Sequence, residues 1–153
     1  MKCSECGAVW LDGNMCQNYF YQMLFWENEN PGYGEVHHLM VLGYYLQHPG
    51  YLSPEGLQEA IKLLQEFLEC GITPLQVRKS RRADVNSGKR TWKIKATKGS
   101  KGTYGRPIKW GIRAEDVVVG GREEYCKNVR RWAASIYEIL KDTGNLSDLS
   151  NSR

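Results

Sequence analysis

A pair of cysteines near the start of the chain, Cys3 and Cys6, constrains the fold more than any other feature. The two thiols are separated by two residues and are followed by Gly7. This spacing lets two thiolates bind one tetrahedral ion, and the glycine lets the backbone turn. A redox-active pair would lie at a helix N-terminus after a strand, and the two preceding residues leave no room for that strand. The spacing therefore favours a zinc knuckle over residues 1–13.

A tetrahedral zinc site needs two further ligands. The candidates are Cys16, His37, His38, His48, Cys70 and Cys126. The apolar spacing predicts helices over about 14–29 and 35–47, and the short turn between them makes the two helices antiparallel. This arrangement brings His48 beside Cys16, whereas His38 lies about 15 Å further along the helix axis. We predict a site formed by Cys3, Cys6, Cys16 and His48, with His38 in place of His48 as the main alternative.

Four protein ligands fill the coordination sphere of a tetrahedral zinc ion and leave no position for a reactive water. The expected site is therefore structural. Such an ion contributes on the order of 10 kcal/mol of apparent binding energy, which is comparable with the stability of a whole domain. Cys70 and Cys126 lie in later predicted helices, and we expect both to be packing residues.

The remainder of the chain has a mainly helical pattern. Ser53 and Pro54 predict a helix start, after which apolar residues recur at spacings of three and four until Gly71. A last helix is expected from about Glu115 or Gly121 to Lys141. Its expected inner face consists of Tyr125, Val129, Trp132, Ile136 and Leu140. The expected fold class is mainly α: a helical bundle with an N-terminal zinc knuckle, in a single domain over residues 1–142 with a flexible tail at 143–153.

Residues 78–113 form a basic insertion with thirteen Lys or Arg against one acid, Asp84, whereas the rest of the chain is net acidic. Alternating residues around Trp92 predict a short β-hairpin within this segment. The charge asymmetry predicts an anionic partner, either a nucleic acid or an acidic protein, although two surfaces of opposite charge can also face each other. The candidate nucleic-acid contacts are Arg78, Arg81, Arg82, Arg90, Lys93, Lys95 and Lys101.

The chain contains no run of eighteen apolar residues, so we expect no membrane-spanning helix. Met1 and Lys2 are followed by polar residues instead of an apolar leader, and five cysteines in such a chain indicate thiols or metal ligands. The expected location is the cytoplasm.

Two motifs carry a resemblance to a known family. The CxxCG start with the lone downstream Cys16, and the pattern HLxVxxYxxQHP from His38 to Pro49, resemble a bacterial family catalogued as a domain of unknown function, DUF5946. Further similarity lies at 106–107, 116–117 and 129–133. Family members often carry an aspartate where this chain has Leu42. The resemblance supports the ligand set and implies no activity.

No catalytic motif of the GxSxG, P-loop, HExxH or GxGxxG type occurs in the chain. The leading hypothesis is a zinc-stabilised binding or adaptor domain that is not an enzyme. A nucleic-acid-binding protein is the first alternative. A zinc-dependent hydrolase is the second, with Glu35 or His38 as general base beside a zinc-bound water. Because neighbouring helical side chains point about 100° apart, we expect one of His37 and His38 to be packed and the other solvated.

Overall fold

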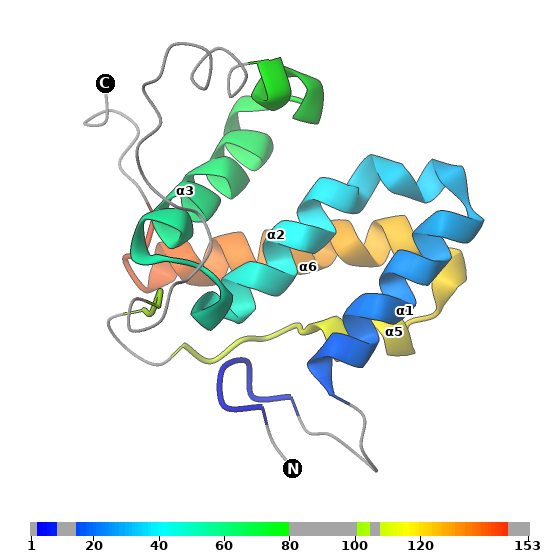
Figure 1. Cartoon of the computed structure of the whole chain (residues 1–153), viewed down its shortest axis with the longest axis horizontal. Helices are drawn as coiled ribbons and strands as arrows, with labels where there is room; N and C mark the ends of the chain where they lie inside the picture. Colours follow the sequence, from blue (N-terminus) through cyan, green and yellow to red (C-terminus); the bar gives the residue numbers. More distant parts are fainter. Residues whose placement is uncertain (1–2, 9–14, 80–100, 105–107, 147–153) are drawn as a thin grey trace. The chain divides into compact units, whose positions relative to one another are not determined.

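The structure is a computed structural model of the 153-residue chain, and it describes residues 3–8, 15–79, 101–104 and 108–146. Helices dominate these residues and no β-strand is found among them, which confirms the mainly α fold class (Figure 1). They divide into two compact units, one from residues 1–48 and 104–145 and the other from residues 49–103 and 146–153. None of the described helices is both long and apolar enough to cross a bilayer.

The first unit contains the N-terminal knuckle and most of the helices. Its elements are α1 (Cys16–Glu29), the 3-10 turn η1 (Pro31–Val36), α2 (His37–Gln47), α5 (Ala114–Val119), the 3-10 turn η4 (Arg122–Glu124) and α6 (Tyr125–Asp142). Helix α2 packs against α6, and α1 packs against α5. The unit is therefore built from helices that are distant in the sequence.

Helices α1 and α2 form an antiparallel hairpin, as predicted (Figure 1). The rings of Phe20 and Tyr44 have centroids 4.6 Å apart. Nearer the turn, Glu27 meets His37 at 2.6 Å between carboxylate and imidazole. Each step forward along α1 is thus matched by an equal step backward along α2. The predicted second helix begins slightly later than expected, because residues 31–36 form the 3-10 turn.

The close packing of α2 on α6 depends on Gly43. A side chain at this position would approach Ile136 Cδ1 to 3.2 Å and the Trp132 ring to 3.4 Å, which is tighter than ordinary van der Waals contact. The glycine therefore lets the fully buried Trp132 indole lie against the α2 backbone. The predicted inner face of the last helix is confirmed, since Tyr125, Val129, Trp132, Ile136 and Leu140 are all buried.

The predicted last helix is two separate helices: Glu115 lies in the first of them, and Gly121 lies between the two. Helix α5 ends at Val119, and α6 begins at Tyr125. Gly121 lies between them with a φ of 85°, a left-handed conformation that interrupts the helix and favours glycine. Asn14, the predicted cap of the first helix, lies outside the described residues, and α1 begins at Cys16 after an extended Met15.

The second unit contains η2 (Pro49–Tyr51), α3 (Pro54–Gln65) and a π-helical turn, η3 (Glu66–Cys70). The predicted cap of α3 is confirmed, because the Ser53 hydroxyl accepts a hydrogen bond from the Gly56 backbone N–H at 2.9 Å. Gly71 follows the last turn with a φ of 66°, as a helix-terminating glycine should. The predicted β-hairpin around Trp92 lies outside the described residues. The single domain over 1–142 and the flexible tail at 143–153 stay predictions.

Candidate metal centre

Three sulfurs and one imidazole lie together at one end of the α1–α2 hairpin. Cys3, Cys6, Cys16 and His48 each offer one ligand atom, and these atoms lie within 4.8 Å of one another. The four residues come from three places: the knuckle, the first turn of α1 and the residue that follows α2. All four are buried, with 3–7% of each residue exposed. The predicted convergence of these four groups is thus found.

The knuckle is held by its own backbone. The Cys3 N–H donates to the Ala8 carbonyl at 2.7 Å, and the Gly7 N–H donates to the Cys3 carbonyl at 3.0 Å. Gly7 has a φ of 81°, which a residue with a side chain rarely adopts. The Cys6 N–H points at Cys3 Sγ, 3.5 Å away. An N–H donor beside a sulfur stabilises the thiolate form that binds metals.

The sulfur geometry fits a tetrahedral ion. Cys6 Sγ and Cys16 Sγ are 3.5 Å apart. Two sulfurs that are each about 2.3 Å from a tetrahedral zinc ion lie about 3.8 Å apart, close to this separation. A hydrogen bond with Cys16, together with burial, raises the pKa of Cys6 far above the ordinary value of a thiol. Only a nearby cation would allow several thiolates to coexist in this space.

His48 presents one specific nitrogen to the sulfurs. Its Nδ1 lies 2.7 Å from the Tyr44 carbonyl, and since a carbonyl only accepts, Nδ1 carries the proton. The lone pair is therefore on Nε2, which is the nitrogen that can bind a metal. The ring also stacks against Tyr44, with centroids 4.4 Å apart. The backbone and a buried ring thus fix both the tautomer and the orientation of His48.

Tyr104, Ile112 and Arg113 brace the residues around the site, which was not predicted from the sequence. Arg113 Nε donates to the Cys6 carbonyl at 2.6 Å, which ties the knuckle to the start of α5. The buried amide of Gln47 donates to the Ile112 carbonyl at 2.7 Å. The Tyr104 hydroxyl donates to the Leu46 carbonyl. These are contacts across more than fifty residues, and no local sequence pattern signals them.

The remaining candidate ligands lie elsewhere. His38 is half-buried on α2, and burial, with smaller contributions from His37 and Arg130, lowers its pKa. Cys70 is exposed at the end of η3 in the other unit, and Cys126 is partly buried in α6. Burial and the nearby Glu35 carboxylate raise the pKa of Cys126. Among the described residues, the four-membered group is the only cluster of this kind.

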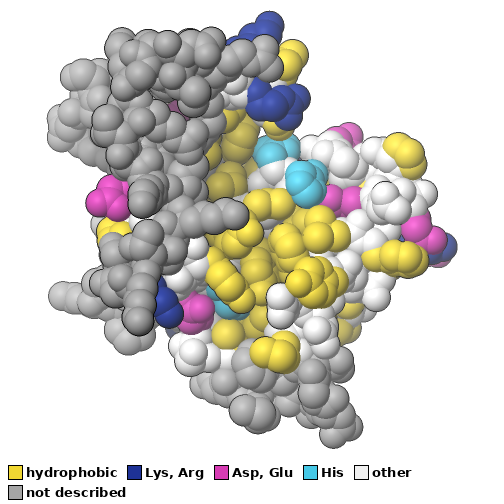
Figure 2. Space-filling view, in the orientation of Figure 1, with side chains coloured by type: hydrophobic (Ala, Val, Ile, Leu, Met, Phe, Trp, Pro, Cys, Tyr) yellow, Lys and Arg dark blue, Asp and Glu magenta, His cyan; other side chains and the backbone are white. Residues whose placement is uncertain are grey.

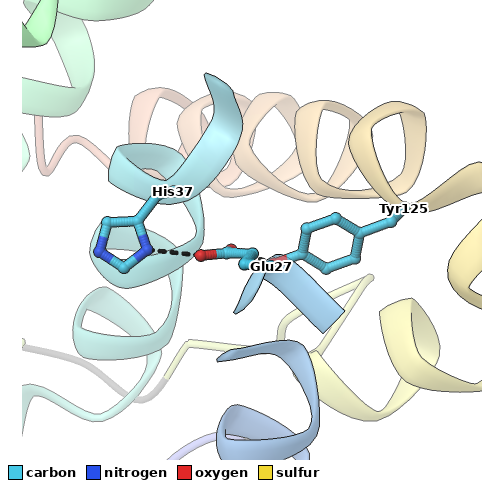
Figure 3. A network of polar contacts seen from close by, with 3 residues as sticks. All are labelled: Glu27, His37 and Tyr125. Carbon is cyan, nitrogen blue, oxygen red and sulfur yellow. Dashed lines mark hydrogen bonds and ion pairs between the residues drawn. The ribbon is translucent and has the colours of Figure 1, made fainter. Parts of the chain in front are cut away.

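The opposite end of the hairpin holds a different polar network (Figure 3). Glu27 of α1 is almost buried, with 8% of its side chain exposed, and its Oε1 accepts from His37 Nδ1 at 2.6 Å. Its other oxygen accepts from the Tyr125 hydroxyl of α6. His37 is half-exposed whereas His38 is half-buried, as expected for neighbours on one helix. Glu35, the candidate general base, is exposed and pairs with Arg130 at 2.8 Å.

The candidate nucleic-acid contacts are only partly described. Arg78 and Lys101 are exposed. Arg81, Arg82, Arg90, Lys93 and Lys95 lie outside the described residues. Nucleic-acid binding by the basic insertion therefore stays a prediction.

A family model described as a family of unknown function, DUF5946, matches residues 1–141. Searches among curated proteins and among solved structures found no match to this chain.

Proposed function

This chain belongs to the DUF5946 family, whose function is unknown, and we propose that it is a binding domain built around a structural zinc ion. One observation carries the proposal. Four buried donors from three separate segments meet within 4.8 Å. Three thiols and an imidazole are ligands that select zinc over hard cations such as magnesium or calcium.

A structural role is favoured over a catalytic one by the number of ligands. Four protein groups complete a tetrahedron, so no corner remains for water or substrate. The acid–base groups that a hydrolase would need, Glu35, His37 and His38, lie at or near the opposite end of α2 from His48. Glu35 and His37 are moreover engaged in ion pairs with Arg130 and Glu27. These features support a closed site without hydrolytic chemistry.

The ion would fix the knuckle to the helical hairpin. Residues 3–8 contain few apolar side chains and contribute only small ones, Cys and Ala, to the core. Their anchoring contacts outside the donor set include the bond from Arg113 to the Cys6 carbonyl. A zinc ion bonded to Cys3 and Cys6 on one side and to α1 and α2 on the other would supply the missing attachment.

Metal analysis of the purified chain tests this proposal. We expect one zinc per chain, and X-ray absorption at the zinc edge should show three sulfurs and one nitrogen. Cys16→Ser and His48→Gln should each release the ion. Cys70→Ser and His38→Gln are matched controls, because they remove the same donor types outside the cluster, and both should keep it.

Two results would contradict the proposal. An oxygen ligand in the absorption spectrum would mean an open corner and would favour the hydrolase alternative. A disulfide between Cys6 and Cys16 in protein purified without oxidant would remove two ligands, and intact mass measurement would detect it.

A further inference from the structure

The outward side of the α1–α2 hairpin is apolar where a surface helix is normally polar. Helix α2, with the sequence HHLMVLGYYLQ, contains no Asp, Glu, Lys or Arg. Helix α1 carries acids only at Glu27 and Glu29, in its last turn. By contrast, α6 is amphipathic, and Lys127, Arg131 and Glu138 lie on its exposed side. A helix that is apolar on both sides is normally covered on both sides.

The apolar residues that α1 and α2 expose lie side by side on one area, which we call the hairpin face. Tyr21 and Phe25 are 55% and 56% exposed. They lie one turn apart on α1, next to residues of both helices that are half-buried. Figure 2 shows apolar side chains gathered over α1 and α2 on the side drawn toward the reader. The hairpin face consists of Phe20, Tyr21, Leu24, Phe25, Val41 and Tyr45.

The area of the hairpin face is in the range that a specific interface needs. An aromatic side chain has about 150–250 Å² of surface, so Tyr21 and Phe25 together expose about 200 Å². The four half-buried members bring the apolar area to roughly 400 Å². Since apolar atoms make up about 60% of an interface, pairing two such faces would bury about 1,300 Å² in total. This exceeds the roughly 1,000 Å² expected of a specific contact.

Charge indicates what covers the hairpin face. The chain carries a net charge of +4, so the overall charges of two copies repel each other weakly. The hairpin face itself contains no charged side chain, so two copies can meet there without burying a charge. A charged partner would gain no ion pair on this face, whereas aromatic rings such as Phe20 and Phe25 can pack against their own copies.

We propose that the hairpin face is a self-association surface, and that two copies of this chain pair across it about a two-fold axis. Each copy would contribute α1 and α2, which gives an interface of four helices in which the same patch faces itself. The modest area and the absence of charged anchors make the dimer a reversible one, with a dissociation constant in the micromolar range. The proposal does not depend on which metal the cysteine site binds.

The test is the mass of the full chain, purified with its metal, in sedimentation equilibrium from about 1 μM to about 1 mM. The mass should rise from 17.5 kDa toward twice that value. Phe25→Glu and Tyr21→Lys introduce opposite charges on the hairpin face, and each should weaken dimerisation at least about tenfold. Val119→Glu is the control, since Val119 is 79% exposed on α5. It should leave the association constant unchanged.

Circular dichroism and zinc content verify that each variant is folded, which is expected because the altered side chains are more than half exposed. Amide chemical shifts that change on dilution should map to α1 and α2. A wild-type chain that stays at 17.5 kDa at every concentration would overturn the proposal. A dimer whose shift changes map to another surface, or one that Val119→Glu weakens as much as Phe25→Glu, would overturn it as well.

Discussion

The two ends of the α1–α2 hairpin are closed in different ways. At one end, Cys16 and His48 meet the two knuckle cysteines in a buried donor set. At the other end, the Glu27 carboxylate accepts hydrogen bonds from His37 and Tyr125. The second end contains both an acceptor and its donors, so it is complete with the chain's own groups. The first end gathers three thiols and an imidazole, which would need a cation to hold them together as deprotonated ligands. Under the proposed function, one hairpin thus joins an end that depends on a metal to an end that does not.

The largest expected effect is therefore loss of the metal. A strong chelator, or the His48→Gln substitution, should release the knuckle, because the apparent binding energy of a structural zinc is on the order of 10 kcal/mol. In hydrogen exchange, residues 3–8 and the first turn of α1 should lose protection, whereas amides around Glu27 should keep most of theirs. The His38→Gln variant serves as control. Equal loss of protection at both ends would contradict the proposed difference between them, since it would mean that the hairpin unfolds as one unit.

The next largest effect is expected from the carboxylate end. Glu27→Ala leaves the buried Tyr125 hydroxyl without its acceptor and should lower the free energy of unfolding by about 3 kcal/mol. Glu29→Ala is a matched control two residues away, because its carboxylate is 44% exposed and makes a long 3.3 Å ion pair with Arg122. Urea denaturation should show little change for the control. Similar losses in the two variants would refute a special role for Glu27, and zinc content should stay unaltered in both.

Tyr125→Phe should cost less than Glu27→Ala. The substitution removes one hydrogen bond from Glu27 but keeps the ring, which packs edge-on to Trp26 at 5.9 Å and lies 5.1 Å from Tyr33. His37 still donates to the carboxylate. We expect a loss of about 1 kcal/mol in the free energy of unfolding, measured by urea denaturation. A loss as large as that of Glu27→Ala would mean that the phenol holds the network alone.

The placement of the four donors was predictable from the sequence because it depends on local rules. A short turn makes two helices antiparallel, and helix rise then separates His38 from His48 by about 15 Å. Both predictions need only the spacing of the apolar residues, which indicates the helices, and the prolines, which indicate where the helices end. The same rules yield the inner face of α6, since Val129 and Ile136 follow the helical period.

The bracing of the site was not predictable in this way. Arg113 was assigned to the basic insertion by its charge, yet its guanidinium binds the Cys6 carbonyl. The buried Gln47 and the Glu27–Tyr125 contact likewise join segments that are far apart in sequence. Such pairings are fixed by how helices pack on one another, as where Gly43 lets α2 approach α6, and no pattern within one segment specifies them.

The smallest effect should come from the exposed ion pair that flanks the carboxylate end. Arg130 holds the pKa of Glu35 below its ordinary value, but Glu35 is exposed, so Arg130→Gln should not measurably change the free energy of unfolding at neutral pH. The informative readout is His38, whose pKa lies below the ordinary 6.5, chiefly through burial and partly through the charges of His37 and Arg130.

Removing the Arg130 cation stabilises the protonated imidazole of His38, so the pKa of His38 should rise but stay below that of an exposed histidine. An NMR titration of the His38 ring measures this shift, with Arg131→Gln, exposed on the same helix, as control. The sign also fixes a stability effect. The unfolded chain protonates His38 at a higher pH than the folded chain, so the free energy of unfolding falls as the pH drops below about 6.5. Because Arg130→Gln brings the folded pKa of His38 closer to the unfolded one, this variant should lose less stability over the same pH range. An unchanged pKa would show that Arg130 acts on Glu35 alone and that burial by itself keeps His38 neutral.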